Sequence, residues 1–214
     1  MKLLRFDDNG TARVGALEGD RIVVLSAPTM TAIITGGDAA LAQAAAEAKA
    51  AARTVPLAGA KLLAPVERPG KYLAIGMNYA KHIEEAKKLG ASAPTNQFWF
   101  NKQTTCVAGP FDEIQPGVTQ ALDYEAELGV VIGRPAKGVS EADAKSHVFG
   151  YLVANDVSAR DWQRHSPTFT MGKSFDTHGP IGPWIVTAAE FPKPGDVVRC
   201  EVDAIGAIEN RVAG

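Results

Sequence analysis

One stretch of the chain, ALDYEAELGVVIG at residues 121–133, constrains the fold more than any other. Asp123, Glu125 and Glu127 alternate along it, and the apolar run 128–132 follows directly. An alternation with a period of two that leads into β-branched residues is typical of a β-strand. The sequence therefore predicts a strand that carries three carboxylates on one face and extends out of a core.

Three carboxylates on one strand face repel each other. Alternate side chains on a strand lie roughly 7 Å apart, and two unit charges there repel by about 2 kcal/mol at an effective dielectric constant near 20. Two interpretations follow. Either water screens the charges along the edge of a sheet, or a bound divalent cation neutralises them.

The composition excludes several classes of protein. The 214 residues suit one domain, or one domain with a small appendage, and can bury a sizeable core. A net charge of -2 provides no basic surface for nucleic acid. The apolar run after Met1 is too short for a signal peptide and no stretch is long enough to span a bilayer, so we expect a cytoplasmic protein with no membrane partner. Cys106 and Cys200 support neither a disulfide framework nor a cysteine-based zinc site.

The pattern of short elements predicts two lobes. Residues 1–66 indicate a small β-rich N-terminal lobe with an Ala-rich helix, for which Asp38 is the expected N-cap. Residues 67–214 indicate a larger catalytic domain, in which short strands are interleaved with short helices. The predicted strands are 2–6, 11–17, 21–25, 72–75, 98–102, 149–154, 183–187 and 197–205, and the predicted helices of the larger domain are 79–89 and 140–148, the latter capped by Ser140.

His82 and Glu85 lie three residues apart on the predicted helix 79–89 and so project from one face. A carboxylate beside an imidazole orients the ring and raises its basicity, which suits a general base. The same spacing on a helix rich in Lys and Glu also fits a surface ion pair. The spacing by itself leaves both interpretations open.

Asp156 follows an apolar strand that ends at Ala154, and strand ends hold side chains firmly. It is either a metal ligand or a cap of the next turn. Carboxylates without Cys or paired His favour a hard cation, namely Mg²⁺ or Mn²⁺, with Ca²⁺ as a further possibility.

Lys173 follows Gly172, which invites comparison with a phosphate-binding loop. That motif requires a glycine five positions before Gly172, where this chain has Pro167, so a nucleotide site is not supported. Lys173 is then either an exposed turn lysine or a cation that binds a substrate carboxylate or an oxyanion.

Six segments of the chain form an ordered set of motifs, namely IGMNYAKHIEE, FWFNKQTT, VAGPFDEI, DYEAELGVVIG, GYLVANDVSARDWQ and MGKSFDTHGPIGPWIVTAAE. Taken in order, they resemble the fumarylacetoacetate hydrolase family. The resemblance implies an α+β fold with a mixed β-roll or barrel as the catalytic lobe, assembled as a homodimer. It makes Glu125, Glu127 and Asp156 metal ligands, His82 with Glu85 the pair that activates water, Lys173 a catalytic and substrate-binding residue, and Gln163 a substrate contact.

The resemblance also implies a reaction. Family substrates are 2-oxo acids such as acylpyruvates, so the expected activity is metal-dependent hydrolysis of a carbon–carbon bond in a 2,4-diketo acid through a metal-bound enolate. The same enolate serves an oxaloacetate-type decarboxylase and a dienoate isomerase or lyase, which are the alternatives.

The chain departs from the family pattern after residue 190. By this resemblance, several dozen residues of the family, including a loop that closes over the substrate, are missing, and residues 190–195 join two parts of the family pattern that are normally far apart. The resemblance therefore also allows a catalytically defective, metal-binding family member.

Overall fold

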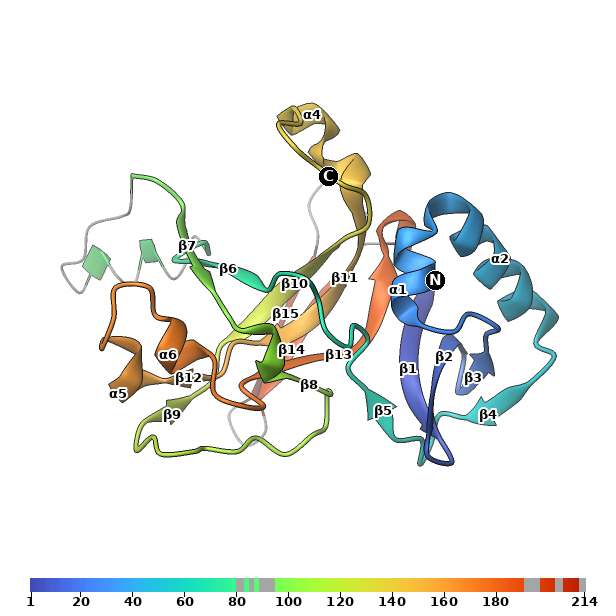
Figure 1. Cartoon of the computed structure of the whole chain (residues 1–214), viewed down its shortest axis with the longest axis horizontal. Coiled ribbons are helices and arrows are strands. Elements are labelled where there is room, and N and C mark those ends of the chain that lie inside the picture. The colour runs from blue at the N-terminus through green and yellow to red at the C-terminus, as the bar shows by residue number, and fades with distance from the viewer. Residues whose placement is uncertain (80–82, 85–86, 89–94, 191–196, 203–205, 212–214) are drawn as a thin grey trace.

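The computed structural model describes residues 1–79, 83–84, 87–88 and 95–190, and the backbone alone of residues 197–202 and 206–211. Its largest feature is a mostly antiparallel sheet in the order β10-β11-β13-β1-β2-β3-β4, to which β5 and β8 add at β1 and β13 (Figure 1). Of the helices in these residues, none is both long and apolar enough to cross a bilayer.

The element bounds agree with most of the expected segments. The strands are β1 (Lys2–Asp8), β2 (Thr11–Glu18), β3 (Arg21–Val24), β4 (Thr54–Pro56), β5 (Leu62–Leu63), β6 (Leu73–Gly76), β7 (Phe98–Asn101), β8 (Val107–Ala108), β9 (Leu122–Asp123), β10 (Ala126–Ile132), β11 (Val148–Asn155), β12 (Ser158–Ala159), β13 (Gly179–Thr187), β14 (Val197–Val202) and β15 (Gly206–Arg211). The helices are α1 (Met30–Thr35), α2 (Gly37–Ala50), α4 (Glu141–Ala144), α5 (Arg160–Gln163) and α6 (Thr170–Lys173), with short 3₁₀ turns at Thr104–Cys106, Lys145–His147 and Ala188–Glu190.

Strand β1 is the middle strand in the order of the largest sheet. Leu3 belongs to a core beneath α1 and α2 that also contains Met30 and Ile33, whereas Leu4 packs on the opposite side of the sheet. Because successive side chains of a strand point to opposite faces, a strand with two apolar residues in sequence needs cover on both faces. One side of β1 pairs with β2 and the other with β13, where Leu3 faces Ile185. The N-terminal strands and the strands of residues 67–214 therefore form one sheet.

Three local expectations are corrected or refined. Helix α2 begins at Gly37 with Gly36 as its N-cap, so the prediction of Asp38 as the cap is wrong; Asp38 lies in the first turn. Ser140 does cap α4, since its side chain accepts a hydrogen bond from the Asp143 N–H. The strand predicted over 197–205 is observed as β14, which pairs with antiparallel β15, and residues 203–205 lie outside the described part of the chain.

The predicted α+β class is confirmed, and among the described residues the strands form open sheets rather than a closed barrel. The predicted junction at residues 190–195 falls almost entirely on residues 191–196, which lie outside the described part of the chain.

Candidate active site

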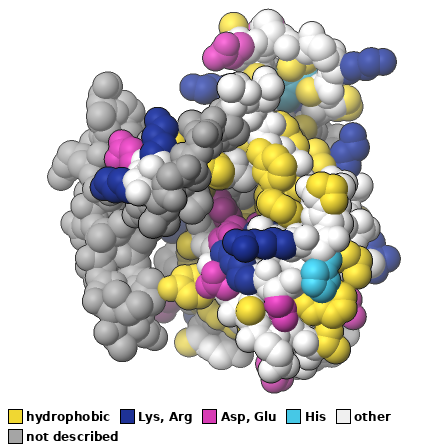
Figure 2. Space-filling view, turned by 90° about the vertical axis from the view of Figure 1, so that its left-hand side faces the viewer, with side chains coloured by type: hydrophobic (Ala, Val, Ile, Leu, Met, Phe, Trp, Pro, Cys, Tyr) yellow, Lys and Arg dark blue, Asp and Glu magenta, His cyan; other side chains and the backbone are white. Residues whose placement is uncertain are grey.

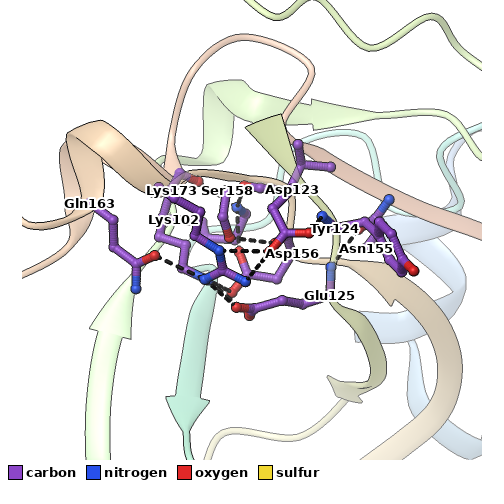
Figure 3. Close-up of polar contacts among 11 residues, drawn as sticks. Lys102, Asp123, Tyr124, Glu125, Asn155, Asp156, Ser158, Gln163 and Lys173 are labelled. Carbon is purple, nitrogen blue, oxygen red and sulfur yellow. Dashed lines mark hydrogen bonds and ion pairs between the residues drawn. The ribbon is translucent and has the colours of Figure 1, made fainter. Parts of the chain in front are cut away.

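The site lies where an antiparallel strand pair is interrupted. β10 pairs with β11 as far as Ala126 and Asn155, and pairing resumes between β9 and β12, where Asp123 faces Ser158. Between these two ladders the Asp156 N–H donates to the Glu125 carbonyl oxygen at 2.9 Å. The interruption thus places Glu125 and Asp156 opposite each other (Figure 3).

Burial along residues 121–132 follows the predicted period of two. Asp123, Glu125 and Glu127 are half-buried, whereas Tyr124 and Leu128 on the other face are exposed. The predicted single strand is nevertheless two strands, because the backbone of residues 124–125 leaves the ladder to meet Asp156.

Lys173 joins two of the carboxylates. Its Nζ lies 2.8 Å from Glu125 Oε2 and 2.8 Å from Asp156 Oδ2, and the side chain is almost completely buried. The close packing of α6 explains its position: a Cβ on Gly172 would lie 2.3 Å from the Gln163 nitrogen, so only glycine permits this approach. Lys173 is therefore not an exposed turn lysine.

Lys102 is a second buried lysine of the site, and the sequence did not single it out. It follows β7, and its Nζ donates to Asp156 Oδ1 at 2.6 Å, to the Val157 carbonyl oxygen at 3.3 Å and to the Lys173 carbonyl oxygen. Burial lowers the pKa of Lys102, and the charge of Asp156 acts in the opposite direction. The one signal in the sequence is a lysine as the last residue of the predicted strand 98–102, which does not reveal its partners.

Arg160 binds the remaining oxygen of Glu125. Its Nη1 lies 2.7 Å from Glu125 Oε1 and donates to Gln163 Oε1 at 2.9 Å, while Nη2 lies 2.8 Å from Asp123 Oδ2. The hydrogen bond from Arg160 lowers the pKa of Asp123. Arg160 therefore links Gln163, a predicted substrate contact, to the carboxylates of Glu125 and Asp123.

Glu127 completes the cluster electrostatically. Burial raises its pKa, the charges of Glu125 and Asp156 add to the rise, and a hydrogen bond from Tyr79 opposes it. Its carboxylate therefore lies within the field of the two others.

The donor chemistry fits a hard divalent cation. Three half-buried or buried carboxylates supply only oxygen ligands, the type that Mg²⁺ and Mn²⁺ prefer. The pKa of Glu127 is raised first by burial and then by the charges of Glu125 and Asp156, and a bound cation would offset both effects. Within the described residues no three His, Cys, Asp or Glu side chains form a complete ligand group. Ammonium groups contact oxygens of Glu125 and Asp156. The assignment of Glu125, Glu127 and Asp156 as ligands stays a prediction.

The predicted pair His82 and Glu85 lies outside the described residues, so its geometry is untested. Lys173 and Asp156 lie in contact, and the roles that the resemblance implies for them stay predictions. The contacts of Lys102 with both residues were not predicted.

A family model described as "Fumarylacetoacetate (FAA) hydrolase C-terminal" matches residues 71–194, and one described as "Rv2993c-like, N-terminal" matches residues 1–65. The chain belongs to the fumarylacetoacetate hydrolase family. A protein of Burkholderia ambifaria whose name suggests a hydrolase is 44% identical over 201 residues, covering 91% of this chain and 69% of the relative. The human mitochondrial oxaloacetate tautomerase FAHD2A is 39% identical over 175 residues, covering 80% of this chain and 55% of the relative.

Solved structures of the family share the fold. The fumarylacetoacetate hydrolase of Exiguobacterium antarcticum has a TM-score of 0.75 at 35% identity, with 93% of this chain and 70% of that chain covered. A maleylpyruvate hydrolase from Sphingobium sp. SYK-6, solved with manganese(II) and pyruvate, has a TM-score of 0.72 at 30% identity, with coverage of 93% and 72%. A 5-carboxymethyl-2-hydroxymuconate delta-isomerase from Mycobacterium smegmatis has a TM-score of 0.70 at 33% identity, with coverage of 93% and 70%. The family thus includes hydrolases, isomerases and a tautomerase.

In this family member, aromatic side chains border the charged cluster. The Lys173 Nζ lies 5.1 Å from the centroid of the Phe100 ring, and the rings of Phe98 and Phe169 are 5.1 Å apart. Figure 2 shows acidic and basic side chains together in the middle of the face that carries α5 and α6, with hydrophobic side chains around them. A cavity of about 250 Å³ lies between β7 and the loop before α6, lined by Trp99, Phe100, Asn101, Pro167, Thr168 and Thr170.

Proposed function

We propose that this protein is a metal-dependent hydrolase of acylpyruvate-type 2,4-diketo acids. The observation that carries the proposal is the contact of one buried ammonium, that of Lys173, with both Glu125 and Asp156 at 2.8 Å. It brings a cationic group and two carboxylates to a single point in a member of a family that contains hydrolases. The maleylpyruvate hydrolase solved with manganese(II) and pyruvate supports the choice of cation and of product class.

Each residue then has a defined task. Glu125, Glu127 and Asp156 would hold Mg²⁺ or Mn²⁺, and Ca²⁺ is a weaker candidate. When bound, the cation supplies Lewis-acid polarisation of the 2-oxo group. Lys173 would donate a hydrogen bond to a substrate oxygen that gains negative charge, which is worth most in a buried site.

The chemical step needs a base for water. His82, assisted by Glu85, would accept a proton from the water that attacks the distal carbonyl carbon. The bond between that carbon and the adjacent methylene carbon breaks, and the methylene carbon then takes up a proton. One acylpyruvate and one water thus give a carboxylic acid and pyruvate. Gln163 would orient the substrate from the side of Arg160.

A second candidate is isomerisation or tautomerisation of a 2-oxo acid such as oxaloacetate. The 39% identity to the human oxaloacetate tautomerase favours it. This reaction moves a proton and a double bond without water, so it needs the carboxylate and lysine groups of the described site but no activated water. Decarboxylation of oxaloacetate is a third reaction at the same groups.

One panel of assays separates these reactions. Acetylpyruvate and oxaloacetate are incubated with Mg²⁺, with Mn²⁺ or with EDTA, and pyruvate, carbon dioxide and the ultraviolet absorbance of the enol are followed. We expect pyruvate and acetate from acetylpyruvate only when metal is present, and His82→Ala should reduce that rate by about 10²-fold or more. Enol exchange of oxaloacetate without pyruvate release would favour the tautomerase, and no turnover of any of these acids would favour a defective metal-binding protein.

We also propose a homodimer in which exposed apolar residues of β10 contribute to the interface. Leu128, Val130 and Ile132 project from one face of β10 and Val153 from β11, and each is more than half or about half exposed. Sedimentation equilibrium should give a dimer for the wild type and a larger share of monomer for Val130→Lys. A monomeric wild type would refute this part of the proposal.

A further inference from the structure

The four oxygens of Glu125 and Asp156 all contact cationic side chains. Lys173 contacts one oxygen of each carboxylate, Lys102 holds the other oxygen of Asp156, and Arg160 holds the other oxygen of Glu125. Only the Lys173 ammonium is shared between the two carboxylates. A divalent cation bound by both residues would have to lie at a similar point between the two carboxylates.

The two buried lysines are held differently. Lys102 donates to Asp156 and also to two backbone carbonyl oxygens, those of Val157 and Lys173, so it is fixed even without the carboxylate. The polar contacts described for the Lys173 ammonium are Glu125 and Asp156, with the Phe100 ring beside it. The position of the Lys173 ammonium therefore depends on the two carboxylates that would bind the metal, whereas Lys102 is also held by backbone carbonyl oxygens.

Two positive charges cannot share this position without a large cost. At separations of a few ångströms the repulsion between an ammonium and a divalent cation is strong, and burial weakens the screening by water. Because Lys173 is 1% exposed, water neither solvates its ammonium nor screens it from a nearby cation. Binding of the cation must therefore move the ammonium away from at least one carboxylate.

We propose that the Lys173 ammonium occupies the cation position in the metal-free protein and leaves it when Mg²⁺ or Mn²⁺ binds. This inference rests on the proposed function, which makes Glu125 and Asp156 ligands. It adds an order of binding: the ammonium becomes available to a carboxylate or an oxo group of the substrate only after the metal has released it. Metal binding thus creates the substrate contact.

The test measures Mn²⁺ affinity rather than activity. Free Mn²⁺ is followed by electron paramagnetic resonance while the wild type and Lys173→Met are titrated. Methionine keeps the unbranched side chain as far as the Cε position and removes the charged Nζ, so we expect Mn²⁺ to bind at least about tenfold more tightly, equivalent to about 1.4 kcal/mol. Turnover should fall at the same time, because the substrate contact is lost.

Lys102→Met is the matched control. It removes the same charge at a similar depth from the other oxygen of Asp156 but does not vacate the shared position. Because the Lys102 ammonium also lies close to Asp156, we expect some gain in Mn²⁺ affinity, but one several-fold smaller than that of Lys173→Met. If Lys102→Met does not fold, Arg160→Gln serves instead, since it frees the other oxygen of Glu125.

The outcomes are distinct. A wild type that binds no Mn²⁺ would refute the proposed function. A wild type that binds Mn²⁺, together with a Lys173→Met variant that binds it equally or more weakly, would overturn this inference alone. An equal gain in Mn²⁺ affinity for the control variant would overturn it too, because removal of any nearby positive charge would then explain the result. If Lys173→Met folds only with Mn²⁺, the replacement of one cation by the other is supported; a variant that stays unfolded with Mn²⁺ would contradict it.

Discussion

At the scale of single residues, the site is built from buried ion pairs. Lys102 is 2% exposed and Asp156 is 4% exposed, and their charged atoms lie 2.6 Å apart. Such a pair contributes little compared with an apolar pair of the same shape, but removal of one partner leaves the other buried and uncompensated. The two residues are therefore expected to be much more sensitive to substitution than surface charges.

Lys102→Met should destabilise the metal-free protein by about 3 kcal/mol, because it removes three donated hydrogen bonds and leaves Asp156 with Lys173 alone. Urea unfolding measures this change. Lys137→Met, at an exposed position in a turn, removes the same charge and should change stability by less than about 0.5 kcal/mol. Equal effects of the two substitutions would show that Lys102 has no special role.

His178 should make stability fall in mild acid. The ring is fully buried, its Nε2 donates to the Gln115 carbonyl oxygen at 3.0 Å, and burial lowers its pKa. The unfolded chain, with a histidine pKa of about 6.5, then binds more protons than the folded protein, so the free energy of unfolding decreases as the pH falls below about 6.5.

His178→Gln should reduce this pH dependence, since glutamine keeps a donor and does not titrate. Urea midpoints at pH 7, 6 and 5 measure the slope. His165→Gln, at an exposed histidine, is the matched control and should leave the slope as it is in the wild type. A slope that His178→Gln does not alter would mean that other groups cause the acid sensitivity.

The residues of the site were predictable to different degrees. The alternation of Asp123, Glu125 and Glu127 is visible in the sequence, because the period of a strand appears directly in residue type. Lys102 was not predictable from the residues alone, since its partner Asp156 is 54 positions away and nothing local marks a lysine as buried. Contacts of this range depend on which strands become neighbours.

At the scale of elements, the short helix α6 is positioned by one glycine. A Cβ at Gly172 would lie 2.3 Å from the Gln163 nitrogen and 2.7 Å from the Ala159 carbonyl oxygen, and both are backbone atoms that cannot rotate away. Because Lys173 is the next residue, any displacement of α6 moves its ammonium relative to Glu125 and Asp156.

Gly172→Ala should therefore lower stability by about 1–3 kcal/mol, as overpacking does. It should also lower turnover by up to about 10²-fold, since a shift of about 1 Å at a reacting group has that effect. Thermal unfolding and the acetylpyruvate assay measure the two changes. Gly70→Ala, where no atom lies within 4 Å of the added Cβ, is the control and should change neither. An unaffected Gly172→Ala variant would refute the packing argument.

Element prediction failed where tertiary contacts intervene. The strand expected over residues 121–133 is split because the Glu125 carbonyl oxygen accepts a hydrogen bond from Asp156 instead of a ladder partner. The helix expected at 140–148 starts with the predicted Ser140 cap but its α-helical part ends at Ala144. Local sequence marks where an element begins more reliably than where packing ends it.

At the scale of the whole molecule, a single sheet crosses the predicted lobe boundary near residue 66. β1 pairs with β2 of the N-terminal part and with β13 of the larger part. The sequence predicted the strands but not this pairing, since the partners Leu3 and Ile185 are separated by most of the chain. Because the two parts share a sheet and a core, we expect them to unfold as one cooperative unit.

Leu3→Ala should therefore destabilise the entire molecule by about 2–5 kcal/mol, because Leu3 is fully buried in the core shared with α1. Trp99 and Trp162 lie in the larger part, whereas Trp184 packs against the core cluster of Leu4 and Ile22. In a Trp184→Phe background, tryptophan fluorescence therefore reports on the larger part while far-ultraviolet circular dichroism reports on the whole chain. Both midpoints should shift together. A shift in circular dichroism alone would mean that the two parts unfold independently.

The proposed function requires that Glu125, Glu127 and Asp156 hold a divalent cation at which a 2-oxo acid binds. An anomalous difference map, recorded near the manganese absorption edge from crystals soaked in Mn²⁺ and pyruvate, tests it most directly. We predict one strong peak among these three carboxylates, with pyruvate beside it and the Lys173 ammonium moved away from at least one of them. A map with no peak there, and with Lys173 still bridging Glu125 and Asp156, would contradict the claim.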